Sequence, residues 1–244
     1  MTTQKDYICP VTDMEFVFVK GGCYHMGDVF GEGEVEERPV HKVCLDDFYI
    51  GKYPVTQKEW VKVMENNPSL THGLNYPVEE VSWYDVRDFI SRLNAQTQKK
   101  HRLPTEAEWE YACRSGGKDE NWAGTNDEEN LGEYAWHDGN SEMMPHPVGQ
   151  KKPNGLGIYD MSGNVWEWIE DVYDENAYSK HSVNRPICIR GSCNRVMRGG
   201  SWRTFPKFAR SSYRSLNAPD FKDFHIGFRL VLEDNLLDFL LINV

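Results

Sequence analysis

Two carboxylates flank a Gly-Asn turn in the stretch Asp160-Met-Ser-Gly-Asn-Val-Trp-Glu167, where residue types and spacing point to metal chemistry. Ca²⁺ prefers carboxylate and carbonyl oxygens, and the carbonyls between the two acids would complete an oxygen cage. The stretch therefore predicts a structural calcium site. The competing prediction is that Asp160 and Glu167 only cap the free amides of a turn.

The cysteines and histidines give a weaker indication of metal binding than these carboxylates do. The six cysteines, at positions 9, 23, 44, 113, 188 and 193, are scattered except for the last two. A chain of 244 residues builds a core without disulfide staples, and it shows no secretion signal, so we expect free thiols. Cys188 and Cys193 have no His or further Cys between them, so zinc is not predicted. The isolated histidines are expected to be surface or hydrogen-bonded side chains.

The stretch Arg198–Leu230, RGGSWRTFPKFARSSYRSLNAPDFKDFHIGFRL, interleaves two kinds of residue. The first kind fixes turns and binds carbonyls or carboxylates, and it comprises Arg198, Gly199, Gly200, Ser201, Trp202, Arg210, Ser211, Arg214, Pro219, Asp220, Gly227, Phe228 and Arg229. The second kind lacks the periodicity of a buried face, and it comprises Arg203, Thr204, Phe205, Phe208, Tyr213, Ser215, Leu216, Asn217, Phe221, Asp223, Phe224 and His225. Rings mixed with small polar groups are typical of a binding surface, whereas Phe208 and Phe224 would equally suit a core.

Three capping boxes predict where helices begin. They are Thr56-Gln-Lys-Glu59, Ser82-Trp-Tyr-Asp85 and Thr105-Glu-Ala-Glu108. In the second helix, Val86, Phe89, Ile90 and Leu93 recur at helical spacing, which predicts one buried face. We expect the polar sides of all three helices to face water.

The rest of the chain is short strands and long connections. Strands are expected at 15–20, 43–50 and 228–232. Connections rich in Gly, Asn, Asp and Pro run from about 115 to 156 and from about 173 to 194. With so little regular structure, buried turns or bound ions must satisfy many backbone groups. The eight tryptophans are expected to fill the core.

The formal charge of −11 argues against a protein that binds nucleic acid, because binding phosphates requires a basic face. The N-terminal sequence has no apolar run behind a basic patch, and the apolar part of the C-terminal end is too short to span a bilayer. We therefore expect no membrane insertion and a cytoplasmic location.

Six motifs together resemble the formylglycine-generating enzyme, or sulfatase-modifying factor, domain family. They are Tyr53-Pro-Val-Thr-Gln57, Pro77-Val-Glu-Glu-Val-Ser-Trp83, Arg102-Leu-Pro-Thr-Glu-Ala-Glu-Trp-Glu-Tyr111, Gly157-Ile-Tyr-Asp-Met-Ser-Gly-Asn-Val-Trp-Glu-Trp168, Arg198-Gly-Gly-Ser-Trp202 and Gly227-Phe-Arg-Leu230. The resemblance implies a single irregular α+β domain with a C-type-lectin-like core at 14–232, preceded by an N-terminal extension, 1–13, and followed by a tail, 233–244. It also implies calcium bound by Asp160, the carbonyls of Gly163 and Val165, and Glu167.

The oxidising enzymes of this family hold copper with two cysteines in the segment after the Arg-Gly-Gly-Ser motif. Here that segment reads Trp202-Arg-Thr-Phe-Pro-Lys-Phe-Ala-Arg210 and contains no cysteine. Soft thiolates select Cu(I), and the residues present cannot replace them, so no copper is expected. The iron-dependent sulfoxide synthases of the family match less well, because the chain has no His-x-x-x-His-x-Glu run.

The interleaved segment is also similar to that of the variable proteins of diversity-generating retroelements, which share the lectin-like fold. Those proteins are mutagenised at adenines of Asn codons, which cannot become Lys, Glu, Gln, Met or Trp. None of these types occurs among the twelve residues of the second kind. The resemblance predicts a non-catalytic protein that binds a protein or other macromolecular ligand through 203–225. The alternative is an oxygen- and metal-dependent oxidoreductase of the same family, acting on a cysteine or a small thiol.

Overall fold

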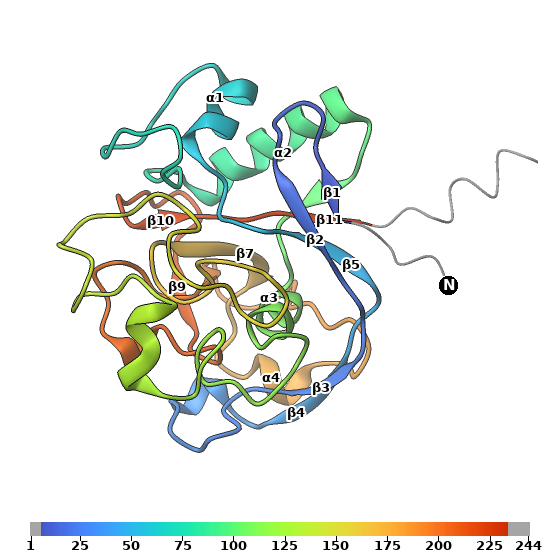
Figure 1. Ribbon diagram of the computed structural model, residues 1–244. Helices are drawn as coiled ribbons and strands as arrows, with labels where there is room; N and C mark the ends of the chain where they lie inside the picture. Colours follow the sequence, from blue (N-terminus) through green and yellow to red (C-terminus); the bar gives the residue numbers. More distant parts are fainter. Residues whose placement is uncertain (1–5, 234–244) are drawn as a thin grey trace, which may run out of the picture.

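A five-stranded sheet brings the first and last described strands together (Figure 1). The computed structural model describes residues 6–233. The sheet has the order β1-β2-β5-β11-β6, and all its pairings are antiparallel. Its strands are β1 (Tyr7–Ile8), β2 (Glu15–Val19), β5 (Phe48–Gly51), β11 (Val231–Leu232) and β6 (His101–Arg102). Since β1 pairs with β2, the sheet includes part of the segment predicted as an N-terminal extension.

A second sheet takes two short strands and the end of a third from residues 198–230, which we call the C-terminal segment. Its order is β10-β7-β8-β9, with β10 parallel to β7 and the other pairs antiparallel. The strands are β10 (Ile226–Gly227), β7 (Trp166–Val172), β8 (Arg195–Arg198) and β9 (Ser215–Asn217), and β3 (Cys23–Met26) forms a separate hairpin with β4 (His41–Cys44). The architecture is the predicted α+β class. Of the predicted tail, residues 234–244 lie outside the described residues.

Two predicted strands are interrupted. The run 43–50 is divided between β4 and β5, because Asp47 accepts a hydrogen bond from the Gly21 amide at 2.9 Å and pairs with Lys20 at 2.7 Å. These contacts turn the chain from the hairpin into the main sheet. The run 228–232 is strand only in β11, and the buried Arg229 before it bonds to Glu167 and to the carbonyls of Gly51 and Tyr159.

All three predicted capping boxes begin helices. These are α1 (Gln57–Met64), α2 (Trp83–Thr97) and α3 (Glu106–Cys113), and in each the cap and the N3 residue bond to one another's amides. The prediction that polar sides face water is wrong for α3, whose residues are all buried. Shorter helices are η1 (Val35–Glu37), η2 (Glu128–Glu133), α4 (Ala177–Lys180) and η3 (Pro206–Phe208). Of these, η2 and α4 lie in connections predicted to lack regular structure.

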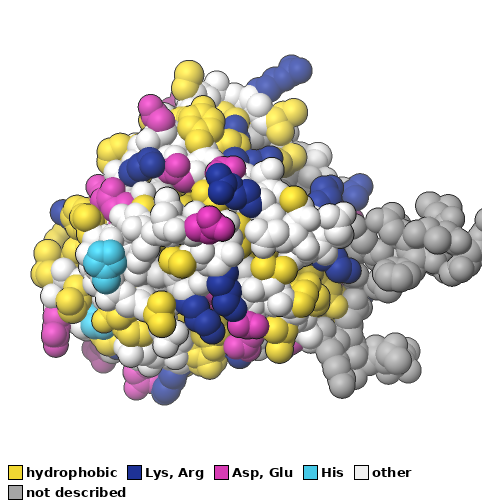
Figure 2. Space-filling view, turned by 90° about the horizontal axis from the view of Figure 1, so that it is seen from above, with side chains coloured by type: hydrophobic (Ala, Val, Ile, Leu, Met, Phe, Trp, Pro, Cys, Tyr) yellow, Lys and Arg dark blue, Asp and Glu magenta, His cyan; other side chains and the backbone are white. Residues whose placement is uncertain are grey.

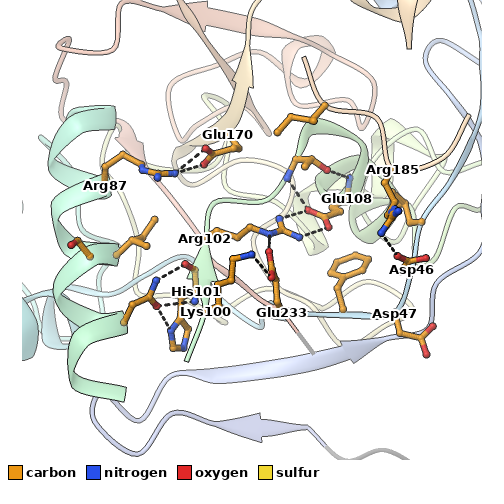
Figure 3. A pocket seen from close by; sticks show the side chains of 17 residues that line it. Asp46, Asp47, Arg87, Lys100, His101, Arg102, Glu108, Glu170, Arg185 and Glu233 are labelled. Carbon is orange, nitrogen blue, oxygen red and sulfur yellow. Dashed lines mark hydrogen bonds and ion pairs between the residues drawn. The ribbon is translucent and has the colours of Figure 1, made fainter. Parts of the chain in front are cut away.

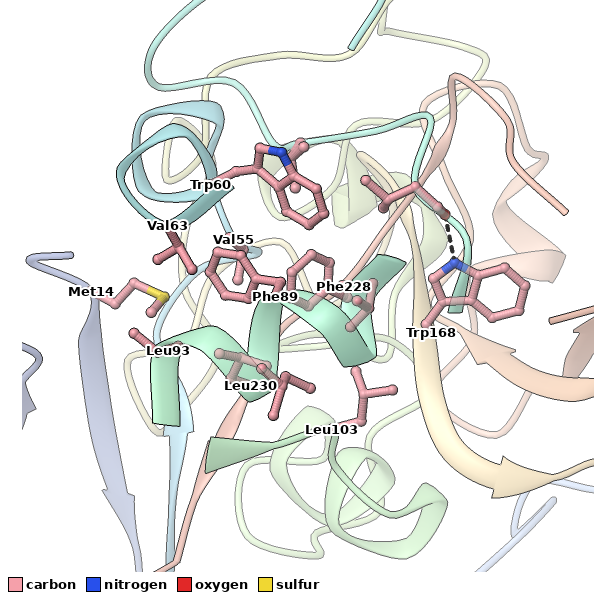
Figure 4. Close-up of a cluster of buried hydrophobic side chains, with 14 of the residues drawn as sticks. Met14, Val55, Trp60, Val63, Phe89, Leu93, Leu103, Trp168, Phe228 and Leu230 are labelled. Carbon is pink, nitrogen blue, oxygen red and sulfur yellow. Dashed lines mark hydrogen bonds between the residues drawn. The ribbon is translucent and has the colours of Figure 1, made fainter. Parts of the chain in front are cut away.

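An aromatic cluster joins α1 and α2 to the C-terminal segment (Figure 4). The Trp60 and Phe89 rings stack with centroids 5.2 Å apart. The Phe228 ring meets both of them edge-on, at 6.1 and 5.5 Å. All three side chains are buried, so Phe228 fixes the end of the C-terminal segment to both helices.

Helix α3 buries acidic side chains because arginines from the C-terminal segment neutralise them. Arg198 pairs with Glu110 at 2.5 Å, and Arg214 pairs with Glu106 at 2.7 Å. All four side chains are fully buried. A buried charge is costly unless it is paired and hydrogen-bonded. The C-terminal segment therefore supplies the counterions that allow α3 to lie inside the domain.

Asp171, a fully buried residue of β7, gives the protein a testable pH dependence. Its oxygens accept hydrogen bonds from the amides of Glu106 and Cys188 at 2.9 and 2.8 Å. Burial, together with the negative charge of Glu106, raises the pKa of Asp171 from 3.8 to about 7. Because the pKa returns to its ordinary value on unfolding, the protonated group stabilises the fold fully below about pH 4, and this stabilisation is lost as pH rises through about 7.

We therefore expect the melting temperature to fall when pH is raised from about 5 to about 8, and the Asp171→Asn variant to show a smaller fall. Scanning calorimetry across this range measures both. An Asp171→Asn variant whose melting temperature changes with pH by as much as that of the unaltered protein would contradict the assignment.

No helix within residues 6–233 is long and apolar enough to cross a membrane. Seen from the α1 and α2 end, Lys and Arg side chains are interspersed with Asp and Glu among apolar groups (Figure 2). This face therefore lacks the single-sign basic field that nucleic-acid phosphates require.

Candidate ligand-binding face

The twelve residues predicted to bind a ligand are all at least partly exposed, and we refer to them together as the C-terminal face. Arg203, Phe205, Leu216 and Phe221 are exposed, whereas Thr204, Phe208, Tyr213, Ser215, Asn217, Asp223, Phe224 and His225 are partly buried. Eleven of the thirteen residues predicted as framework are buried, and the exceptions, Pro219 and Asp220, lie in a surface turn. The two kinds of residue in the sequence thus correspond to surface and interior.

The guanidinium of Arg198, at the end of β8, holds the chain behind this face. It donates to the carbonyl oxygens of Ser211, Ser212 and Tyr213 at 2.7, 2.7 and 2.6 Å. Its remaining strong contact is the ion pair with Glu110 of α3. Because three successive carbonyls bind one buried group, residues 211–213 have a fixed path, which leaves the Tyr213 ring at the surface.

Two further arginines attach the same segment to η1. Arg210 pairs with Glu37 through two hydrogen bonds of 2.7 and 2.9 Å, and both residues are buried. Arg214 donates to the Glu36 carbonyl at 3.1 Å. A bidentate arginine–carboxylate pair fixes orientation as well as distance. The η1 turn, with its exposed Val35, therefore lies against the C-terminal segment.

Aromatic rings supply most of the apolar area of the C-terminal face. Phe205 and Phe221 are 61% and 40% exposed. The rings of Phe208 and Tyr213 meet edge-on with centroids 5.1 Å apart, and both pack against the hydrophobic core. Phe224 lies 5.8 Å from the ring of the buried Trp202. The two competing predictions for Phe208 and Phe224 thus each hold in part, because both rings combine an interior contact with partial exposure.

Polar groups lie among these rings. The Arg203 guanidinium lies 5.3 Å from the Phe224 ring centroid, and the His225 Nδ1 contacts the Asp223 carboxylate. Burial lowers the pKa of His225, although Asp223 opposes this change. The face thus offers one cation, hydrogen-bonding groups and exposed rings, which suit recognition. Residues 198–230 contain no thiol for redox chemistry.

A loop and the first turn of α2, neither of which was predicted to bind a ligand, border the C-terminal face. The Asp138 amide donates to the Thr204 carbonyl at 3.2 Å, and the Tyr84 amide donates to the Pro219 carbonyl at 3.4 Å. Near these contacts the side chains of Tyr84 and Met143 are 58% and 65% exposed. The sequence signal for Tyr84 is a large ring outside the buried stripe of α2. Met143 has no such signal, because its loop has no periodicity.

The expectation of free thiols is wrong for one pair, because Cys23 and Cys44 form a disulfide. They lie directly opposite each other in the β3–β4 hairpin, a relation that spacing along the chain does not reveal. The other four cysteines are free: Cys9 and Cys113 are buried, Cys188 is partly buried and Cys193 is exposed. None of the six belongs to the C-terminal face.

The two carboxylates predicted to bind calcium differ in their contacts. The Glu167 carboxylate accepts hydrogen bonds from Arg229 Nε and Nη2 and from Trp109 Nε1, each at 2.7 Å. Asp160 accepts one hydrogen bond from the Gly149 amide at 2.8 Å, and its Oδ1 is buried without a partner. Glu167 is thus paired with a cation, whereas Asp160 keeps one buried oxygen without a partner, and calcium at this turn stays a prediction.

The surroundings of the turn do not decide between the two predictions. Gly163 and Val165, whose carbonyls are the other predicted ligands, are buried in the turn before β7. Within residues 6–233, no group of three or more His, Cys, Asp and Glu side chains is arranged to hold a metal ion. The predicted site has only two such side chains, with two carbonyls, so it stays a prediction.

A cavity of about 960 Å³ lies beside α2 and β6 (Figure 3). Its charged groups pair with one another: Arg87 with Glu170 at 2.8 Å, and Arg102 with Glu108 at 2.6 Å. None of the twelve residues of the C-terminal face lines it.

The family described as "Sulfatase-modifying factor enzyme 1-like domain" matches residues 8–234. The chain is 32% identical to the "Chaperone protein LppX" of Paenibacillus barcinonensis, over 70% of this chain and 75% of that protein. It is 28% identical to the formylglycine-generating enzyme of Streptomyces coelicolor, over 90% of each. It also matches the "Serine/threonine-protein kinase pkn1" of Chlamydia pneumoniae at 30% identity, but spans only 37% of that protein.

Two solved structures are similar over nearly their whole length. "Treponema denticola variable protein 1" has a TM-score of 0.86 and 29% identity, and the match covers 94% of this chain and 99% of that one. PvdO from Pseudomonas aeruginosa has a TM-score of 0.84 and 27% identity, with 96% and 100% covered. These likenesses confirm the predicted α+β domain with a C-type-lectin-like core. The chain belongs to the sulfatase-modifying factor enzyme 1-like domain family, as its six motifs predicted.

Proposed function

We propose that this protein is a non-catalytic ligand-binding protein, of the class of variable proteins of diversity-generating retroelements, and that the C-terminal face binds a protein or other macromolecular ligand. The observation that carries the proposal is the division of one segment, in which twelve residues reach the surface while eleven of thirteen framework residues are buried. Exposed positions tolerate substitution far better than buried ones. The likeness to "Treponema denticola variable protein 1" supports the same class.

The composition of the face supports a macromolecular ligand. Exposed Phe205, Leu216 and Phe221, together with Arg203, combine apolar area with one cation. Large rigid rings give contact area at low cost in conformational entropy, and they are enriched at protein interfaces. The bordering side chains of Tyr84 and Met143 would extend the same contact area.

The expected cytoplasmic location stays a prediction. The Cys23–Cys44 disulfide is more typical of an oxidising compartment. Fractionating the host cells and detecting the protein with an antibody distinguishes a cytoplasmic location from an oxidising compartment.

A displayed library tests the proposed function. All twelve positions of the C-terminal face are randomised together, and a matched library randomises the buried Gly199, Gly200, Ser201, Ser211 and Ser212 instead. We expect most clones of the first library to stay folded by protease resistance, and some to bind a test protein such as streptavidin after selection. At Phe208 and Tyr213, which also pack on the core, apolar residues should be retained.

Two outcomes would contradict the proposal. The first library could unfold as often as the matched one, which would make the face part of the interior. Alternatively, the copper- or iron-loaded protein could convert the cysteine of a sulfatase-motif peptide to formylglycine in air, as mass spectrometry would show. The identity with the Streptomyces coelicolor enzyme is the observation that favours this oxidoreductase alternative.

A further inference from the structure

We propose that the guanidinium of Arg229 occupies the structural role predicted for calcium, so that the fold needs no metal at the Asp160–Glu167 turn. Arg229 belongs to the Gly227-Phe-Arg-Leu230 motif and is fully buried. Its Nε donates to both oxygens of Glu167, at 2.9 and 2.7 Å, and its Nη2 donates to Oε1 at 2.7 Å. The pair is thus a forked, charge-assisted contact.

The same guanidinium also binds two main-chain carbonyls. Arg229 Nη1 donates to the Gly51 carbonyl at 3.0 Å, and Nη2 donates to the Tyr159 carbonyl at 2.9 Å. One cation therefore joins β7, the end of β5 and the residue before Asp160. A carboxylate with carbonyls from separate segments is the kind of ligand set that Ca²⁺ uses to fix loops, so the guanidinium performs the same mechanical task.

A calcium ion could reach Glu167 only at high cost. Its two oxygens already accept bonds from Arg229 and from Trp109 Nε1, and a carboxylate has about four lone-pair sites. Binding an ion there would displace Arg229 from its carboxylate and leave its charge buried with only the Gly51 and Tyr159 carbonyls. The arrangement therefore selects the side chain over the ion.

This clamp also fixes one end of the C-terminal face. Gly227 of β10 pairs with Glu167 of β7, and the Trp166 amide donates to the His225 carbonyl at 2.9 Å. If the face binds ligands as proposed above, that binding should not require calcium. This last consequence rests on the proposed function, whereas the clamp itself does not.

Calorimetry of the whole protein tests the clamp. The melting temperature in millimolar CaCl₂ and in EDTA should agree within about 1 °C, because no ion binds the native state selectively. Arg229→Lys keeps the charge but loses the fork, and it should lower the melting temperature by roughly 10 °C in either buffer. The matched control is Arg185→Lys, whose partner Asp46 is exposed, and it should leave the melting temperature unchanged.

A rise of several degrees on adding CaCl₂, reversed by EDTA, would overturn the proposal. Isothermal titration of CaCl₂ into the unaltered protein decides the question even if Arg229→Lys does not fold, since measurable binding at this turn, abolished in Asp160→Asn, would also overturn it. The selected streptavidin-binding clones separate the two proposals. Binding that is retained in EDTA supports metal independence, binding that disappears in EDTA counts against it, and failure to obtain folded clones contradicts only the proposed function.

Discussion

Replacing Arg198 with alanine is expected to lower the free energy of unfolding by about 3–5 kcal/mol, because it breaks a buried ion pair and leaves Glu110 with Arg114, at 3.3 Å, as its remaining cation. Glu110 of α3 would lose its 2.5 Å contact with the Arg198 guanidinium. The carbonyls of Ser211, Ser212 and Tyr213 would lose their common donor. Urea unfolding followed by tryptophan fluorescence measures the change.

The control for this prediction is Arg185→Ala. Arg185 pairs with Asp46 at 3.1 Å, but the two side chains are 72% and 73% exposed, so the expected loss is at most about 1 kcal/mol. If Arg198→Ala cost no more than this control, the Arg198 guanidinium would not organise the segment behind the C-terminal face. If Arg198→Ala still folds but no longer binds a ligand, the loss would indicate that binding needs the main-chain path of residues 211–213.

The second large effect is expected for Phe228→Ala, which should cost about 3–5 kcal/mol through lost burial and the cavity left behind. The Phe228 ring contacts both Trp60 and Phe89 in the core between α1 and α2. Phe205→Ala is the matched variant, the same change in the same segment but at a side chain 61% exposed. It should alter the free energy of unfolding by no more than about 0.5 kcal/mol.

These two variants should have opposite profiles in a binding measurement. In a selected streptavidin-binding clone that keeps both phenylalanines, Phe205→Ala should weaken binding without changing stability, whereas Phe228→Ala should act on stability first. Equal losses of stability would show that Phe205 belongs to the interior and that its exposure is not functional. Surface plasmon resonance alongside urea unfolding provides both readouts.

Local signals in the sequence were sufficient for the helices. The capping boxes at Thr56, Ser82 and Thr105 each begin a helix, because a cap is satisfied by residues only three positions apart. Strand limits were less predictable, since they depend on distant partners. The 43–50 run is broken by the contacts of Asp47 with Gly21 and Lys20.

Charge was the property that sequence reasoning misjudged. Glu106 and Glu110 look like the polar side of a surface helix, but they are buried because Arg214 and Arg198, far along the chain, neutralise them. The pairing of Glu167 with Arg229 was also not predicted from the sequence. The Cys23–Cys44 disulfide likewise depends on a register between two strands.

The family, the α+β domain and the division of the C-terminal segment could be predicted without a structure, because motifs, caps and the alternation of framework with non-framework residues are local properties. The cation that each buried carboxylate meets could not, nor could the arginines that hold the turns behind the C-terminal face. A buried charge is stabilised by whichever counterion the fold brings within contact, and partners such as Glu167 and Arg229 are distant in the sequence.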